Sequence, residues 1–185
     1  MQSTKTRNLA LVALMAAVIC IMGPLSIAIP FSPVPISFTN LAIYLTVMIL
    51  GWKLGTLSYL VYLALGFVGL PVFSAFTSGP GKLLGPTGGY LIGFIFMALV
   101  SGWFVNKFSG KFYMYILGMV LGTLIAYAFG TVWLGYQAGL SFGKALMAGV
   151  IPYIPGDIIK IYVGTAVGNE VRKRLLKANI RTFEG

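Results

Sequence analysis

Long uncharged stretches dominate the pattern of polar and apolar positions along this chain. Four stretches carry no charged residue: 8–52, 54–81, 83–106 and 112–143. A helix needs about 20 apolar residues to cross the hydrocarbon core of a bilayer, and each stretch is longer than that. The pattern therefore indicates an integral membrane protein that crosses the bilayer several times.

Prolines, glycines and short charged turns divide these stretches into helices. Pro30, Pro33 and Pro35 interrupt the first stretch, because proline lacks a backbone donor and restricts the residue before it. The sequence GWKLG at 51–55 marks a turn, and a short amphipathic helix is expected within 137–150. The interruptions predict an all-α protein with six transmembrane helices near 8–27, 38–50, 54–69, 88–106, 112–136 and 152–176.

Two of the connecting segments are apolar rather than polar. Segments 29–37 and 70–87 are rich in proline or glycine and also carry phenylalanine, valine and either isoleucine or leucine. Irregular backbone at membrane depth is tolerated only where it is buried in protein or lines a cavity. We therefore expect two ordered loops that cap a ligand pocket, with the first loop folded back over the bundle as a lid.

The basic residues give the orientation of the six expected helices. Lys82 and Lys144 fall on one side of the membrane, and Lys160 lies within the last span. The other ten basic residues fall on the side of the two termini: Lys5, Arg7, Lys53, Lys107, Lys111, Arg172, Lys173, Arg174, Lys177 and Arg181. Cytoplasmic loops carry the excess of lysine and arginine in membrane proteins. Both termini are therefore predicted to be cytoplasmic, and both apolar loops to lie on the outer side.

Composition agrees with a single transmembrane domain over residues 1–185. The chain is 58% hydrophobic and 9% charged, against about a quarter charged in soluble proteins. The net charge of +10 does not indicate nucleic-acid binding, because the basic residues flank apolar spans. No cleavable signal pattern precedes the first span, so we expect a retained helix in a multi-pass protein of the plasma membrane. The single Cys20 excludes a disulfide within the chain.

Asp157 and Lys160 are the first candidates for a functional site. They lie within the apolar run IPYIPGDIIKIY at 151–162, and Asp157 is the only acid in the first 169 residues. Ionisable groups at membrane depth are expensive and usually face a cavity, paired with one another. A spacing of three places both on one helix face. The alternative is a structural ion pair, but buried pairs contribute little net stability, which favours a ligand site.

Polar and glycine residues at two helix starts are further ligand candidates. Thr39 and Asn40 open the second expected helix, where helix capping is the alternative role. Gly88 and Gly89 open the fourth, within GPTGGYLIGF, and permit close backbone approach to a ligand. Gly89 also belongs to a series spaced by four residues, which is typical of close helix packing, so both roles stay open.

Aromatic residues gather at the expected outer surface: Tyr90, Trp133, Tyr136 and Tyr153. An aromatic belt at the membrane interface explains such residues by default. One or two of them can instead stack on a ligand ring, and Tyr90 and Tyr153 are the candidates because they adjoin the motifs above.

The first helix carries small residues at Ala10, Ala13 and Ala17. Alanines three or four residues apart let another helix approach closely. Packing within the bundle is one interpretation, and a surface for a partner subunit is the other.

Several kinds of chemistry have no residues to support them. The chain has no histidine, and Gly81-Lys82 is followed by Leu83 rather than by the serine or threonine of a phosphate-binding loop. We therefore expect no ATPase activity, no metal and no cofactor, and an enzyme is the weakest interpretation. A stand-alone secondary carrier for a small vitamin-like molecule remains an alternative to a binding subunit. Such carriers commonly show internal repeats and sites at the midplane, and neither feature is evident here.

Three motifs in this order resemble one family over nearly the whole chain. PVPISFTN, GPTGGYLIGF and PYIPGDIIK are similar to the corresponding stretches of BioY, the biotin-specific S component of energy-coupling factor transporters. Asn40 departs from the glutamine expected at its position but keeps an amide.

The resemblance implies a high-affinity biotin-binding membrane subunit. It implies biotin held on the outer side beneath the first and third loops, with Asp157 and Lys160 at the family's polar positions of the last helix. It also implies that Ala10, Ala13 and Ala17 meet a transmembrane coupling subunit, which acts with two ATPase subunits to deliver biotin inward. By this resemblance the whole subunit topples in the membrane to release its ligand.

Overall fold

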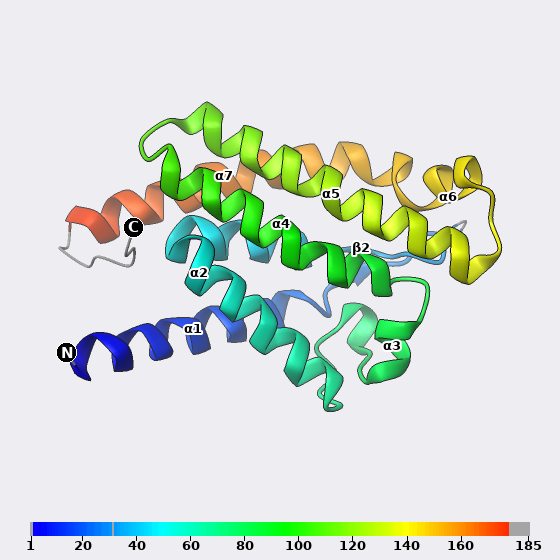
Figure 1. Cartoon of the computed structure of the whole chain (residues 1–185), viewed down its shortest axis with the longest axis horizontal. Coiled ribbons are helices and arrows are strands. Elements are labelled where there is room, and N and C mark those ends of the chain that lie inside the picture. Colours follow the sequence, from blue (N-terminus) through cyan, green and yellow to red (C-terminus); the bar gives the residue numbers. More distant parts are fainter. Residues whose placement is uncertain (1, 31, 178–185) are drawn as a thin grey trace.

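The computed structural model describes residues 2–30 and 32–177 and is almost entirely helical (Figure 1). Two-residue strands β1 (Ser26–Ile27) and β2 (Ile36–Ser37) pair antiparallel, with Ser26 opposite Ser37. The helices, with two short 3₁₀ turns η1 and η2, are α1 (Gln2–Met22), α2 (Thr39–Phe67), η1 (Ser74–Phe76), α3 (Pro80–Leu84), α4 (Gly88–Lys107), α5 (Phe112–Ala138), α6 (Phe142–Gly149), η2 (Ile151–Tyr153) and α7 (Ile154–Lys177).

Five helical segments of the described chain are long and apolar enough to cross a membrane, rather than the six expected. They are α1, α2, α4, α5 and the segment from α6 to α7. The difference arises because the second and third expected spans are joined in the 29-residue helix α2. The short helix expected within 137–150 is present as α6.

Helix α2 is interrupted at Gly51. This residue has φ 74° and ψ −172°, a conformation that only glycine adopts readily. A Cβ atom built on Gly55 would lie 3.1 Å from the Cα atom of Val47. Eight residues of straight helix span about 12 Å, so the chain must turn back on itself between these two positions. Two antiparallel arms result, over 39–50 and 52–67.

The first helix ends at Met22, five residues before the expected Ile27. Pro24 explains the difference, because proline cannot donate to the helix and biases the residue before it away from helical geometry. Residues 26–27 instead pair with residues 36–37 as β1 and β2, which closes the base of the first loop.

Close helix approach at small residues holds the bundle together. A Cβ atom on Gly93 would lie 2.8 Å from the Cα atom of Ala126, and one on Gly122 would meet Ser101 and Met97. Helices α4 and α5 therefore touch backbone to backbone, as membrane helices do at small residues. Fully buried aromatic side chains fill the remaining core, among them Tyr44, Tyr59, Tyr62, Phe73 and Tyr115.

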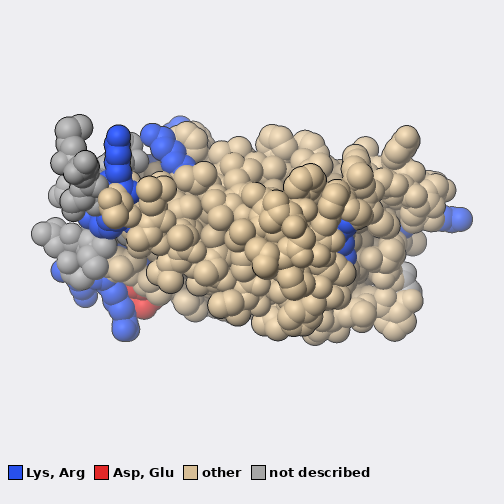
Figure 2. All heavy atoms as spheres, turned by 90° about the horizontal axis from the view of Figure 1, so that it is seen from below, with Lys and Arg blue, Asp and Glu red and all other residues tan. Residues whose placement is uncertain are grey.

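The two ends of the bundle differ in charge. Figure 2 shows the lysines and arginines gathered where α1 begins and α7 ends, with most of the surface between the ends uncharged. We call this the basic end, defined by Lys5, Arg7, Lys53, Lys107, Lys111, Arg172, Lys173, Arg174 and Lys177. Arg181, counted with them above, lies outside the described residues.

The opposite end, here the loop end, consists of segments 23–30, 32–38 and 68–87 together with α6. The two loops are joined where the Ala75 N–H donates to Ser26 Oγ at 2.9 Å and to the Pro24 carbonyl at 3.1 Å. Ala75 has φ 59° and Phe76 has φ 56°, which are uncommon values for residues other than glycine. The second loop is therefore held in a strained conformation by its bonds to the first.

Candidate functional site

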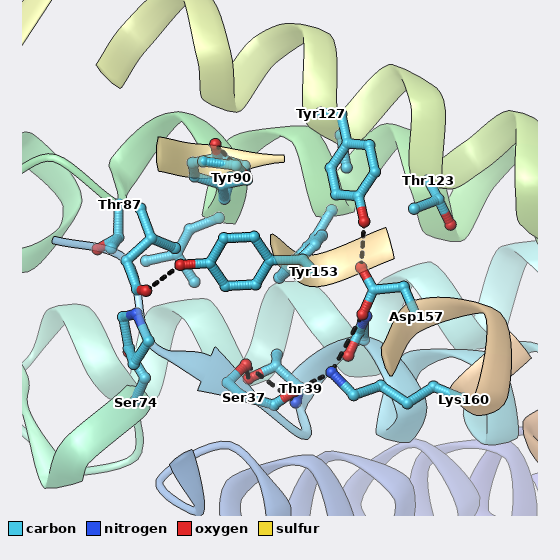
Figure 3. A pocket seen from close by; sticks show the side chains of 17 residues that line it. Ser37, Thr39, Ser74, Thr87, Tyr90, Thr123, Tyr127, Tyr153, Asp157 and Lys160 are labelled. Atoms are coloured by element: carbon cyan, nitrogen blue, oxygen red, sulfur yellow. Dashed lines mark hydrogen bonds and ion pairs between the residues drawn. The ribbon is translucent and has the colours of Figure 1, made fainter. Parts of the chain in front are cut away.

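A cavity of about 650 Å³, part of it open to the surroundings, lies at the loop end (Figure 3). Its walls come from both loops and from α2, α4, α5, α6, η2 and α7, which brings together segments between residues 34 and 160. The polar and aromatic lining residues are Ser37, Thr39, Asn40, Ser74, Thr87, Tyr90, Phe94, Thr123, Tyr127, Tyr153, Asp157 and Lys160, and the small or aliphatic ones are Val34, Pro35, Leu91, Ala126 and Gly149.

Asp157 is the centre of the polar side of this cavity. It lies in the first turn of α7, where the helix dipole favours a carboxylate, and Pro155 precedes it at a position that needs no donor. Its Oδ1 accepts from Asn40 Nδ2 at 2.8 Å and from Lys160 Nζ at 3.1 Å, and its Oδ2 accepts from the Tyr127 hydroxyl at 2.6 Å. Three donors from three helices therefore fix one buried carboxylate.

Lys160 is the second charged group of the cavity, as its spacing from Asp157 predicts. Both side chains are 10% exposed. The ammonium also donates to the Ser37 carbonyl at 2.7 Å and lies 5.9 Å from the centre of the Phe38 ring. Lys160 thus ties α7 to the end of the first loop, and the pair is both buried and hydrogen-bonded, as a charge inside a membrane protein must be.

Thr39 and Asn40 both line the cavity from the first turn of α2. Phe38, rather than either of them, occupies the N-cap position. The Thr39 hydroxyl accepts from Ser37 Oγ at 3.0 Å. Asn40 Oδ1 accepts locally from the Leu41 N–H at 3.1 Å while its amide nitrogen reaches Asp157. The side chain of Asn40 therefore belongs to the polar network rather than to a helix cap.

Tyr90 and Tyr153 form part of the aromatic wall. The Tyr90 hydroxyl donates to the Gly149 carbonyl at 2.8 Å. The Tyr153 hydroxyl bonds to the Val34 carbonyl and lies 2.8 Å from Ser32 Oγ, which in turn donates to the Ala148 carbonyl at 2.7 Å. Tyr153 thus bonds to the first loop, which contributes Val34 and Pro35 to the cavity lining.

Gly88 and Gly89 are the candidates that the structure corrects. Neither lines the cavity. A Cβ atom on Gly88 would lie 1.7 Å from the Leu83 carbonyl oxygen, and one on Gly89 would lie 2.3 Å from Trp133 Cβ. Gly88 permits close packing against α3 and Gly89 against α5, and for Gly89 this is the alternative that its spacing had left open.

Several lining residues were not among the sequence candidates, notably Ser37, Ser74, Thr87, Thr123 and Tyr127. The Thr87 hydroxyl is buried and has no hydrogen-bond partner among the described residues. Thr123 and Tyr127 are four residues apart in the otherwise apolar α5. Polar side chains on one face of a membrane helix signal a cavity, so this pair was detectable in the sequence.

Charges outside the cavity lie away from this network. Lys82 of α3 is half-buried and does not line the cavity, and its burial lowers the pKa of its ammonium group. Asp157 and Lys160 are therefore the charged residues that line the cavity in the described part of the chain.

The small residues of α1 do not line the cavity. Ala10, Ala13 and Ala17 are exposed, whereas Ala16 and Ile19 are buried against the bundle. The three alanines are thus available on the outer face of α1 rather than used in packing within the chain.

Comparison with known proteins gives one consistent result. The chain matches the BioY family over residues 1–177. It is 35% identical over 179 residues to the biotin transporter BioY2 of Lactococcus lactis, covering 97% of both chains. It is 37% identical over 175 residues to the biotin transporter BioY of Rhizobium etli, covering 90% of this chain and 93% of the relative.

A solved structure agrees with the sequence comparisons. The crystal structure of an S component for biotin from an ECF-type ABC transporter is similar with a TM-score of 0.87 and 33% identity, covering 94% of each chain. Family, fold and the helices long enough to span a membrane identify a transport protein rather than an enzyme, and a multi-pass membrane protein. The chain belongs to the BioY family.

Proposed function

We propose that this chain captures biotin at the loop end and delivers it inward together with a separate coupling and ATPase module. The observation that carries the proposal is the cavity in which a buried Asp157–Lys160 pair adjoins aromatic and aliphatic walls. Biotin has the same division, because a polar ureido ring is fused to an apolar thioether ring with a chain that ends in a carboxylate.

The polar side of the cavity keeps one donor and one acceptor for a ligand. A carboxylate has about four lone-pair sites, and Asp157 uses three of them within the described chain. An ammonium has three donors, and Lys160 uses two. A ureido group can donate an N–H to Asp157 Oδ2 and accept from Lys160 at its carbonyl. We therefore assign the ureido ring to this side.

The other side of the cavity suits the chain of the ligand. Leu91, Phe94 and Ala126 offer apolar contact. The unpaired Thr87 hydroxyl and the nearby Ser74 offer donors at the second loop. A hydroxyl that is buried without a partner is unfavourable, so a carboxylate that accepts from Thr87 relieves this cost. No cofactor enters this account, and biotin is the transported substrate.

The proposed topology is a single domain with six membrane crossings in the plasma membrane. The two arms of α2 count as separate crossings, since Gly51 reverses the chain. The arm 39–50 is only about 18 Å long, and the apolar segments 23–30 and 32–38 extend its path. The excess of lysine and arginine at the basic end supports cytoplasmic termini and, with them, a cavity on the outer side.

The proposed partner surface is the outer face of α1. Its small residues Ala10, Ala13 and Ala17 are exposed, so a helix of a coupling subunit can approach closely there. Two ATPase subunits supply energy through that coupling subunit, because this chain carries no phosphate-binding loop.

Calorimetry of the purified chain in detergent tests the ligand. Biotin should bind tightly without ATP or an ion gradient, whereas riboflavin and thiamine should give no heat. An equal response to all three compounds, or none to biotin, contradicts the assignment. Purification with natural partners tests the module, because a stand-alone carrier would bring no ATPases with it.

A further inference from the structure

An open apolar groove of about 630 Å³ lies at the basic end, away from the biotin cavity. Trp52 at the turn of α2 and Leu99, Val100, Trp103 and Phe104 of α4 line it. The groove exists because Gly102 lets the two helices touch, since a Cβ atom there would lie 2.5 Å from the Cα atom of Trp52. It faces the surroundings, because Trp103 is 44% exposed.

Two lysines stand at the rim of this groove. Lys107 Nζ lies 4.3 Å from the centre of the Trp103 ring, and Lys53 Nζ lies 5.4 Å from the centre of the Trp52 ring. Both lysines are exposed. Ring faces hold cations in this way and so position the two ammonium groups above the apolar floor.

Neither ammonium forms an ion pair with a carboxylate within the described part of the chain. Glu170, the described acid of the basic end, accepts from Arg174 at 3.0 Å. The two lysines are thus positioned by aromatic rings but not neutralised by an acid of the described chain.

A second apolar groove, formed by α4 and α5, serves as an internal comparison. It lies toward the loop end and is lined by Gly89, Ile92, Ala128, Phe129, Val132 and Trp133. Trp133 there donates to the Gly85 carbonyl at 2.9 Å, and no cation lies over its ring among the described residues. The combination of an apolar floor and a cationic rim therefore distinguishes the groove at the basic end.

We propose that this groove is a binding site for an anionic phospholipid. One acyl chain lies along Leu99, Val100 and Phe104, and the phosphate lies between the ammonium groups of Lys53 and Lys107. The ligand must be an amphiphile with an apolar chain and an anionic head, because the floor is apolar and the rim is positive. Basic pockets between membrane helices recognise anionic head groups in this way.

Tryptophan fluorescence in vesicles tests the site. Dibrominated lipids quench tryptophan on contact, and the Trp133→Phe variant leaves Trp52 and Trp103 to report. In phosphatidylcholine vesicles, dibrominated phosphatidylglycerol should bind more tightly than dibrominated phosphatidylcholine. Each lysine near a charged lipid contributes about fivefold, so the preference is expected to lie between about fivefold and 25-fold.

Matched variants separate the groove from general charge. Lys53→Gln with Lys107→Gln should abolish the preference, whereas Lys144→Gln, which removes a lysine from the loop end, should keep it. Circular dichroism checks that each variant is folded. Equal quenching by both lipids in the Trp133→Phe protein overturns the proposal, and so does a preference that survives the double substitution.

Two further arms test other occupants of the groove. Glycerol phosphate at constant ionic strength should not compete with phosphatidylglycerol, and competition would show a site for a free head group and overturn the lipid assignment. Quenching should also be independent of protein density in the vesicle. If quenching by both lipids falls as the density rises, a second copy of the chain covers the groove and the proposal is wrong.

Discussion

The loop end and the basic end use polar groups in opposite ways. At the loop end, Asp157 and Lys160 are each 10% exposed, and their bonds run to each other and to the buried or partly buried groups of Asn40, Tyr127 and Ser37. At the basic end, the Arg174–Glu170 pair is 78% and 57% exposed. Exposed pairs of this kind contribute almost nothing to stability, whereas buried charges need a complete set of partners.

This difference suits the loop end to recognition of a ligand and the basic end to anchoring in the bilayer. A desolvated pair has fixed geometry and a strong local field, which suits selection of one ligand. Exposed lysines and arginines keep their water and instead set the orientation of the chain in the bilayer. Arg172 is the exception at the basic end, because it is 5% exposed and donates to the Val105 carbonyl and to Ser109 Oγ. It joins α7 to the α4–α5 turn.

The largest effect is expected from the carboxylate of the loop end. Asp157→Asn should reduce biotin affinity by more than about 100-fold, because the amide cannot accept from Asn40, Lys160 and Tyr127 together, and breaking a buried pair costs about 3–5 kcal/mol. Lys160→Met should also weaken binding. Calorimetry gives the affinity and thermal melting of the ligand-free protein gives the stability.

Glu170→Gln at the basic end is the control for Asp157→Asn. It removes an exposed acid and should change neither affinity nor melting by a measurable amount. Normal biotin binding by Asp157→Asn and Lys160→Met would show that the buried pair is structural.

A large side chain on the outer face of α1 should abolish uptake but leave biotin binding unchanged. Ala13→Trp places a large side chain on an exposed position and blocks close approach of another helix. Biotin binding should be unchanged, while ATP-dependent uptake and co-purification of the ATPases should be lost. Leu124→Trp, on an exposed position of α5, is the control and should keep all three. Loss of binding with an intact complex would assign the alanines to packing of the bundle.

A substitution at Gly51 tests whether the basic end can be destabilised without loss of biotin binding. Gly51→Ala should lower the free energy of unfolding by about 2–3 kcal/mol, because the positive φ is strained for alanine and the Cβ atom would lie 2.4 Å from Asn106 Oδ1. Gly110→Ala also has a positive φ but meets nothing within 4 Å, so it should cost less. Thermal melting measures both, and a lower biotin affinity per folded molecule would contradict the independence of the two ends.

The smallest effect is expected from the tyrosine that fastens the lid. Tyr153→Phe removes the hydroxyl that bonds to Val34 and Ser32, and one such bond contributes about 1 kcal/mol. Biotin should dissociate about fivefold faster with little change in association, as stopped-flow measurements can determine. Tyr136→Phe, at an 84% exposed position, is the control. Equal dissociation rates in the two variants would show that the lid bond plays no part in retention.

Local sequence rules predicted much of the fold. The charge-free stretches gave α4 and α5 within two residues of their ends, because a change from lysine to a long apolar run marks a membrane boundary in any context. The end of α1 was misjudged, although Pro24 was visible, because the pairing of 26–27 with 36–37 is a tertiary feature. The turn expected at 51–55 is present within α2, because Gly51 takes a non-helical conformation there and the chain reverses.

The sequence revealed the part of the site where unusual residues lie close together along the chain. It did not reveal which distant residues would contact them. Asp157 and Lys160 stand out because charge is rare within the apolar run. Tyr127 was detectable as a polar position on one face of α5, but its bond to Asp157, 30 residues away, depends on how α5 packs beside α7. Gly88 and Gly89 show the reverse error, because a glycine motif signals close approach without saying whether a ligand or a helix approaches.

The bonds from Ala75 to Ser26 and Pro24 have a mechanical consequence. Ser26 also belongs to the strand pair at the base of the first loop, so a displacement of either loop pulls on the other. The two loops should then move together over the cavity rather than independently of each other. Ligand dissociation should therefore follow a single exponential in time. Ser26→Ala removes one of the two hydrogen bonds that join the loops, so it should loosen them and increase the dissociation rate.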